Sequence, residues 1–270
     1  MLEMLETPRV TVPALGFGTW QLGPDVAYDA VRTALEVGYR HIDTAQLYEN
    51  EEAVGRAIAD SEVDRDDVFL ATKVAPENAE PQNVRASTLA SLERLRTDHV
   101  DLLLLHWPTD VAPLEETMAA LTRAAEEHRT RYIGVSNFPS QVLDRAAHLA
   151  PIVTDQVEHH PYLAIDAIRE AADEHDLFVT AYSPLAKGEV LEDDVLREVA
   201  EEHDRTPAQV TLAWLLRSGV AAIPRSSDPK HIAANFEALD LELTDEEIAR
   251  IDALDRGMRL VDPPFAPTWD

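Results

Sequence analysis

The feature that most constrains the fold is a regular alternation between short apolar runs and amphipathic helical patterns. Apolar runs of strand length recur and are separated by segments long enough for a helix. The expected strands cover residues 15–19, 39–43, 68–73, 100–105, 132–136, 152–156, 178–181 and 221–224. This series of strand–helix units in a chain of 270 residues predicts an α/β fold, a single (β/α)8 TIM barrel over residues 1–270.

The segments between the strands carry helical periodicity. Helices are expected at residues 25–37, 51–59, 81–95, 114–128, 141–148, 165–175, 206–216 and 229–238, with a further helix from residue 244. Thr206, Pro207 and Gln209 give the clearest start signal, because they can form a capping box with proline in the first turn. The N-terminal stretch is expected to form a hairpin lid, and the proline-rich tail at 259–270 a C-terminal loop.

A doubly wound parallel sheet is the alternative architecture for such an alternation. It would require a glycine-rich turn after the first strand that leads directly into a helix. The segment GFGTW contains Gly16 and Gly18, but it lacks the third glycine and the helix start. Any nucleotide bound by this chain is therefore expected to be held in another way.

The chain carries 51 acidic and 23 basic residues, a formal net charge of −28. Such a charge repels nucleic acid and anionic membranes, so neither is expected as a partner. The simplest interpretation is a solvated acidic surface. The more specific one is adaptation to molar salt, where a screening length of about 3 Å removes most of the self-repulsion. We predict a halophilic protein that loses structure on desalting, which circular dichroism melts in low and molar KCl would check.

Composition also limits the chemistry and the location. The chain has no cysteine, which excludes disulfides, thiolate metal sites and cysteine nucleophiles. No apolar run approaches the roughly 18–20 residues of a membrane span, and the acidic N-terminus does not resemble a signal peptide. We expect a cytoplasmic protein, and a monomer, because no apolar seam interrupts the charged surface.

Polar or aromatic side chains follow all of the expected strands. They are Thr19, Trp20, Asp43, Tyr48, Lys73, His106, Trp107, Ser136, Asn137, Gln156, Tyr182, Ser183, Arg225 and Ser226. Each alone has an ordinary explanation, such as a helix cap, a surface lysine or a buried histidine. In a barrel, however, the carboxyl ends of the strands meet at one mouth, where active sites lie. Their shared position therefore indicates an active site.

Four of these residues suggest a carbonyl reductase. Tyr48 can donate a proton near neutral pH if a cation lies nearby, and Lys73 can provide that cation. Asp43 can hold the lysine in place, and His106 can orient a carbonyl group. Lysine occurs only three times in the chain, so its presence at position 73 indicates that an amine is needed there.

Longer stretches around these residues resemble the aldo-keto reductase family over the full length of the chain. The matching segments are GFGTW, HIDTAQLYENE, FLATKV, DLLLLHWP, YIGVSNF, TDQVEHHPYL, AYSPLAKG and IPRSSDPKHIAANF. The short tail and the GVSNF and VEHHPYL segments are most similar to the prokaryotic branch that reduces small aldehydes and dicarbonyl compounds. The resemblance implies hydride transfer from NAD(P)H to a carbonyl carbon, with Tyr48 as general acid. Lys73 would lower the pKa of that tyrosine toward the working range.

The resemblance also implies a set of cofactor contacts. Ser136, Asn137 and Gln156 match the family's anchors for the nicotinamide carboxamide. Tyr182 matches the aromatic residue that stacks on the ring. The other positions on the cofactor side are Thr19, Trp20, Ser183, Leu185, Gly188, Arg225, Ser226, His231 and Asn235. His231 stands where the family has an arginine for the 2′-phosphate, so NADPH is expected as cofactor with NADH tolerated.

Aromatic residues near the mouth are expected to form the walls of the substrate pocket. The pocket residues are Trp20, Tyr48, His106, Trp107 and Phe138, with Phe265 and Trp269 of the tail as further candidates. A metal site at His159 and His160 is disfavoured, because neighbours in a strand point to opposite faces, and no metal is expected. The alternative function is a non-catalytic NADP(H)-binding sensor or interaction protein on the same fold.

Overall fold

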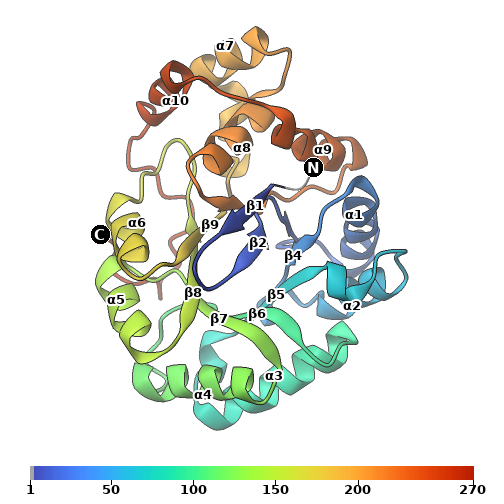
Figure 1. The fold of residues 1–270 in the computed structure, drawn as a ribbon, viewed down its shortest axis with the longest axis vertical. Coiled ribbons are helices and arrows are strands. Elements are labelled where there is room, and N and C mark those ends of the chain that lie inside the picture. The colour runs from blue at the N-terminus through green and yellow to red at the C-terminus, as the bar shows by residue number, and fades with distance from the viewer. Residues whose placement is uncertain (1–2) are drawn as a thin grey trace.

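The computed structural model describes residues 3–270. Within this range, eight parallel strands form one sheet in which each strand pairs with the next along the chain. The strands are β3 (Phe17–Gly18), β4 (His41–Asp43), β5 (Phe69–Val74), β6 (Val100–Leu105), β7 (Thr130–Ser136), β8 (Ile152–Glu158), β9 (Phe178–Tyr182) and β10 (Ala221–Ala222). Helices surround the sheet, as Figure 1 shows.

The first and last strands of the sheet also meet, so the sheet closes on itself. Leu15 and Ala222 form a parallel bridge. The amides of Gly16 and Gly18 donate hydrogen bonds to the carbonyl oxygens of Ala222 and Pro224, at 2.8 and 3.0 Å. The predicted (β/α)8 barrel is thereby confirmed. The regular part of β10 is shorter than the predicted strand, because Pro224 has no amide proton to continue the ladder.

Eight of the helices in the described range follow the strands in alternation. They are α1 (Pro24–Val37), α2 (Glu51–Ala59), α3 (Pro81–Leu95), α4 (Leu114–Glu126), α5 (Ser140–Leu149), α6 (Asp166–Glu174), α8 (Pro207–Arg217) and α9 (Pro229–Phe236). Short 3-10 turns lie between them at Gln46–Tyr48, Arg65–Asp67, Pro76–Asn78, Ala186–Glu192 and Glu237–Asp240. The capping box predicted at Thr206 is present, and Gly55 lets α2 approach the backbone of Leu95 closely.

Two further helices extend the pattern. The helix α10 (Asp245–Asp252) begins after Thr244, as the sequence predicts, with a second capping box. The helix α7 (Asp194–Glu202) is not among the predicted elements. It is an additional helix that lies before α8 in the connection between β9 and β10, where the repeating strand–helix pattern predicts a single helix. Its start is well specified, since the Asp193 side chain accepts hydrogen bonds from the amides of Val195 and Leu196.

An antiparallel hairpin closes one end of the barrel. Its strands β1 (Met4–Glu6) and β2 (Thr11–Pro13) lie across the centre of the ring in Figure 1. Val10 and Val12 pack inside the barrel in a small apolar cluster with Phe69 and Leu102. Arg9 donates a hydrogen bond to the carbonyl of Ile152, the first residue of β8. The hairpin therefore covers the amino-terminal strand ends and leaves the carboxyl ends open.

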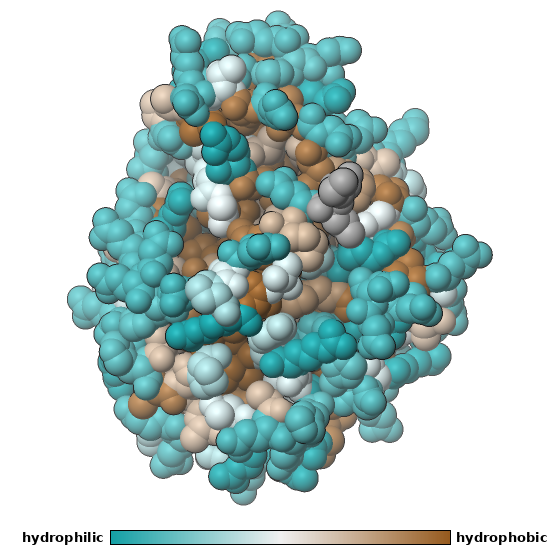
Figure 2. Space-filling view, viewed as in Figure 1, coloured by the Kyte–Doolittle hydropathy of each residue, from teal (hydrophilic) through white to brown (hydrophobic). Residues whose placement is uncertain are grey.

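The outer face of the barrel packs against the helices in the main hydrophobic cluster, which contains most of the buried aliphatic residues. Figure 2 shows hydrophilic side chains over most of the periphery, in agreement with the excess of acidic residues. Large exposed apolar side chains in the described residues are few and scattered. No helix in residues 3–270 is both long and apolar enough to cross a membrane.

Candidate active site

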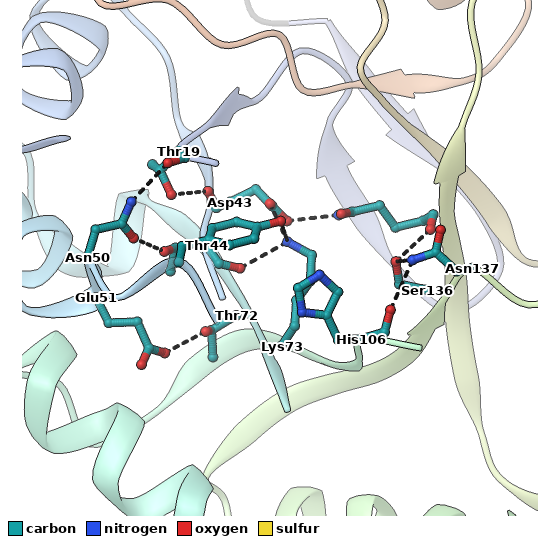
Figure 3. Close-up of polar contacts among 12 residues, drawn as sticks. Thr19, Asp43, Thr44, Asn50, Glu51, Thr72, Lys73, His106, Ser136 and Asn137 are labelled. Carbon is teal, nitrogen blue, oxygen red and sulfur yellow. Dashed lines mark hydrogen bonds and ion pairs between the residues drawn. The ribbon is translucent and has the colours of Figure 1, made fainter. Parts of the chain in front are cut away.

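Lys73 lies at the centre of a buried polar cluster at the carboxyl end of the barrel. It is a β5 residue whose side chain points into the barrel and has almost no exposed surface. Its ammonium group donates hydrogen bonds to Asp43 Oδ1 at 2.5 Å, to the carbonyl of Thr44 at 3.0 Å and to the Tyr48 hydroxyl at 3.3 Å (Figure 3). Each ammonium proton therefore has an acceptor, which offsets part of the cost of burying the charge.

The chain after β4 places Tyr48 over this lysine. Asp43 is the last residue of β4, and the 3-10 turn Gln46–Tyr48 follows at once. Gln46 fixes the turn, because its side-chain oxygen accepts hydrogen bonds from the amide of Ala75 at 3.0 Å and from Asn78 at 3.1 Å. Gln46 was not among the predicted site residues, although it lies within the same family-like segment, HIDTAQLYENE, as Tyr48.

Two more residues of that segment act as supports. Asn50 donates hydrogen bonds to the carbonyls of Thr19 and Leu22 and accepts one from the Thr44 hydroxyl, at 2.8–3.0 Å. It thus ties the loop after β3 to the loop after β4, as Figure 3 shows. Glu51 is buried and accepts hydrogen bonds from Thr72 and, through two nitrogens, from Arg94. These contacts hold β5 in register beside Asp43.

Burial changes the acidity of the groups in this cluster. It raises the pKa of Tyr48 well above its usual range, and the charge of Asp43 adds to the rise. Burial lowers the pKa of Lys73, an effect that the Asp43 carboxylate opposes. The expectation that the pKa of Tyr48 is lowered therefore does not hold in this structure, because burial and the charge of Asp43 both raise it. The phenol at rest is protonated, as a general acid must be.

His106 stands beside Tyr48 at the end of β6. The two rings meet edge to face with centroids 5.6 Å apart. Burial lowers the pKa of His106 well below its usual range, with a smaller contribution from Lys73, so the ring is neutral at neutral pH. Its Nδ1 is buried and finds no partner among residues 3–270. The neutral ring therefore favours the tautomer that carries its proton on Nε2.

A cavity of about 400 Å³ opens above these side chains. Of the predicted pocket residues, Trp20, Tyr48, His106 and Trp107 line it, and so does the tail candidate Phe265, whereas Trp269 does not. Phe138 does not: it has no exposed surface and lies in the main hydrophobic cluster. The backbone turns inward there, because Asn137 takes a left-handed conformation with φ of 66°. Lining residues without a pocket prediction are Leu47, Ser136, Gln156, Tyr182, Ser183, Lys187, Leu260, Val261, Asp262 and Pro263.

A second cavity of about 370 Å³ adjoins the first. The predicted cofactor residues that line it are Trp20, Tyr182, Ser183, Leu185, Gly188 and Arg225. Ser136 and Gln156 line the first cavity instead. The two cavities share the side chains of Trp20, Tyr48, Tyr182, Ser183 and Lys187. A ligand in the second cavity would therefore reach the residues around Lys73.

The other predicted cofactor residues line neither cavity. Thr19 is buried and its hydroxyl donates to the carbonyl of Asp43. Asn137 donates to the carbonyl of His106 and accepts a hydrogen bond from Tyr182 at 2.7 Å. Ser226, His231 and Asn235 lie beyond Arg225, in the turn that leads into α9 and on that helix.

Comparisons with known proteins agree with this geometry. The model of the "Aldo/keto reductase family" matches residues 14–256. The chain belongs to the aldo/keto reductase family.

Characterised relatives and solved structures lie close to this aldo/keto reductase. It is 43% identical over 267 residues to "Methylglyoxal reductase DkgB" of Salmonella typhi, which covers 97% of this chain and all of the relative. It is 42% identical over 258 residues to an "Aldo-keto reductase" of Mycolicibacterium vanbaalenii, with 94% and 92% covered. A crystal structure described as a candidate 2,5-diketo-D-gluconic acid reductase B has a TM-score of 0.97, with 39% identity and 100% and 98% covered.

A further structural neighbour carries a bound cofactor. The crystal structure of the Gox0644 D53A mutant in complex with NADPH has a TM-score of 0.91 and 34% identity, and covers 99% of each chain. Family membership makes the protein an oxidoreductase of a kind that uses nicotinamide cofactors.

The C-terminal tail of this aldo/keto reductase forms one wall of the first cavity. Its position depends on Glu158, the fully buried last residue of β8. The Glu158 carboxylate accepts hydrogen bonds from the amides of Leu260 at 2.8 Å and Val261 at 2.9 Å, and lies 3.1 Å from His160 Nε2. Burial alone would raise the pKa of Glu158, but these hydrogen bonds lower it below its usual range. Sequence patterns did not indicate this role.

Other contacts fasten the rest of the tail. Lys187 donates a hydrogen bond to the carbonyl of Leu260 at 2.8 Å. Both backbone polar groups of Leu260 are therefore bound, since Glu158 accepts from its amide. Near the end of the chain, the Asp270 carboxylate accepts hydrogen bonds from the amide and hydroxyl of Ser140. Phe265 and Trp269 meet Trp107 edge to face, with centroids 5.5 and 6.2 Å apart.

Proposed function

We propose that this protein reduces small aldehydes and ketones, including dicarbonyl compounds such as methylglyoxal, to alcohols with NADPH. The observation that carries the proposal is the contact of Lys73 with both Asp43 and Tyr48, beside a cavity that Tyr48 and His106 line. A protonated phenol held beside a buried ammonium group can act as a proton donor. The names of the relatives, methylglyoxal reductase and diketogluconic acid reductase, support the substrate class.

The residues present fit a nicotinamide dinucleotide. The second cavity is a groove whose lining includes Tyr48 and Asp43, and its walls supply aromatic, hydroxyl and arginine side chains. When bound there, the cofactor supplies the hydride that reaches the carbonyl carbon. Tyr182 is held by Asn137 at 2.7 Å, so its ring is fixed at the place where the two cavities meet.

The protein residues would manage the proton and the carbonyl oxygen. Tyr48 donates its hydroxyl proton to the oxygen as negative charge develops there. Lys73 stabilises the resulting phenolate, and the Asp43 carboxylate keeps the lysine in position. Neutral His106 donates a hydrogen bond from Nε2 to the same oxygen and so orients the carbonyl. Gln156 donates to the second oxygen of Asp43 at 2.8 Å, which fixes the carboxylate.

We infer a preference for NADPH over NADH, with NADH tolerated. Arg225 lines the groove beyond the catalytic end and its guanidinium is oriented by a hydrogen bond to Gln21. It can pair with a phosphate, and Ser226 and the start of α9 lie next to it. His231 in place of arginine removes one cation from this group. Catalytic efficiency measured with both cofactors tests the preference, which fails if NADH equals or exceeds NADPH.

The decisive experiment measures NADPH oxidation in high KCl with methylglyoxal, small aldehydes and a keto-sugar, for wild type and Tyr48→Phe. We expect the variant to lose about 10²–10⁴-fold in kcat, because only the proton donor is removed. NADPH binding, followed by fluorescence titration, should be unchanged. Turnover that survives in Tyr48→Phe would refute the role of the tyrosine. Wild type that binds NADPH but turns over no carbonyl would favour the non-catalytic sensor.

A further inference from the structure

A second group of chemically active side chains lies on the outside of the barrel, away from the cavities. Asp144 and His148 are four residues apart on α5, so they share one face of the helix. His175 ends the neighbouring helix α6. One possible ligand atom from each of the three residues lies within 4.8 Å of the other two, and no other such trio occurs among residues 3–270.

The contacts within this trio already bring the ligand atoms together. Asp144 Oδ1 lies 2.8 Å from His175 Nε2 and 3.6 Å from His148 Nδ1. His148 Nδ1 also lies 2.8 Å from the carbonyl oxygen of Asp144, a contact that orients its ring. The two imidazoles meet edge to face with centroids 4.9 Å apart. Both distances of His148 are to Nδ1, so this nitrogen is the one placed to bind a metal, in exchange for its contact with the carbonyl oxygen.

We propose that Asp144, His148 and His175 bind a divalent transition-metal ion and thereby link α5 to α6. Two imidazoles and one carboxylate suit Zn²⁺, Ni²⁺ or Cu²⁺, whereas Mg²⁺ and Ca²⁺ prefer oxygen ligands alone. The trio is accessible to solvent, since the exposed fractions of His148 and Asp144 are 69% and 49%. Water can complete the coordination sphere, and the net charge of −28 raises the local concentration of divalent cations.

Calorimetric titration with Zn²⁺ in molar KCl tests the site, with Mg²⁺ titrated in parallel. We expect one Zn²⁺ per chain for wild type, and binding weaker by about tenfold or more in His148→Ala. His148 is mostly exposed, so its removal should leave the fold intact, which far-UV circular dichroism checks. The matched control is His203→Ala, which removes a histidine paired with a single carboxylate, that of Glu247 at 2.7 Å. This control should bind Zn²⁺ like wild type.

Co²⁺ provides a second readout, because its visible absorption reports coordination by imidazole. Wild type should give a saturable band that is absent in His148→Ala and retained in the His203→Ala control. The proposal is overturned if His148→Ala binds Zn²⁺ as tightly as wild type. It is equally overturned if Mg²⁺ matches Zn²⁺, since the acidic surface would then account for all of the binding.

Discussion

The cluster around Lys73 and the tail wall at residues 259–270 border the same cavity but are held in different ways. The cluster lies at the ends of β4, β5 and β6, and its buried groups are fixed by backbone and side-chain hydrogen bonds within the barrel. The tail has no regular secondary structure and is held by a few side chains, above all Glu158. The groups proposed for chemistry are thus built into the fold, whereas the pocket's shape depends on a few contacts.

The largest expected effect follows from breaking the cluster. We predict that Lys73→Met lowers kcat by about 10²–10⁴-fold, because the developing phenolate loses its cation. Our proposal makes Lys73 and Tyr48 parts of one unit, so the loss in Lys73→Met/Tyr48→Phe should scarcely exceed that of the worse single variant. Steady-state kinetics of the two single variants and the double variant check this. Losses that multiply would show that the two residues act independently.

The same substitution should also destabilise the fold. Removing the ammonium leaves the buried Asp43 carboxylate without its counterion, a situation that costs about 3–5 kcal/mol. Asp43→Asn/Lys73→Met removes both charges, so it should recover much of the free energy of unfolding while activity stays low. Chemical denaturation in molar KCl distinguishes the two effects. Recovery of activity along with stability would mean that folding alone explains the loss.

An intermediate effect is expected from releasing the tail. Glu158→Ala leaves the amides of Leu260 and Val261 without their acceptor, at a cost of about 1–3 kcal/mol. Because the tail forms a wall of the pocket, KM for the carbonyl substrate should rise about tenfold while kcat changes little. The affinity for NADPH should stay the same. Glu158→Gln, which keeps one carbonyl oxygen, should lie between wild type and Glu158→Ala.

A variant without residues 259–270 provides the control for this prediction. In that background Glu158→Ala should add little to KM, because the tail through which the carboxylate acts is already gone. A further large rise in KM would show that Glu158 affects the pocket directly. If Glu158→Ala lowered kcat as much as Lys73→Met does, the tail wall and the Lys73 cluster would no longer differ in their effect on catalysis.

The same comparison explains what could be predicted from sequence. Asp43, Lys73 and His106 come together because strand ends converge in a barrel, so a correct strand assignment places them correctly. The predicted limits of α2 and α3 agree with the structure, since α2 has an amphipathic pattern and α3 has proline in its first turn. The strand-end residues and the helix limits could be predicted because they depend on local sequence patterns and on the regular topology of the barrel.

The features that escaped prediction depend on contacts between distant backbone groups or on burial. Glu158 binds backbone amides more than 100 residues away in the sequence. Every residue except proline has such an amide, so the residue types do not reveal this contact. Phe138 turns into the core because of the left-handed backbone at Asn137. The pKa of Tyr48 rises chiefly because of desolvation, which depends on the depth of burial rather than on residue types.

The smallest expected effect on stability concerns Asp155, a barrel residue whose pKa is affected by the charge of the tail residue Asp270. Its carboxylate is fully buried on β8, and one oxygen has no hydrogen-bond partner among residues 3–270. The other lies 3.5 Å from the amide of Phe138. Burial raises the pKa of Asp155 well above its usual range, and the charge of Asp270 in the tail adds to the rise.

Asp155→Asn should therefore stabilise the protein by about 1–2 kcal/mol at neutral pH. The folded state holds the Asp155 proton to a higher pH than the unfolded chain, whose carboxyl has a pKa of about 3.9. Stability in wild type is thus complete below that value and declines as pH rises toward the folded pKa. Urea unfolding of both proteins at several pH values should show a difference that vanishes in acid. A stability difference that is independent of pH would mean that packing, and not charge, causes the effect. A smaller difference in an Asp270→Asn background would show that the charge of Asp270 contributes to the cost of ionising Asp155.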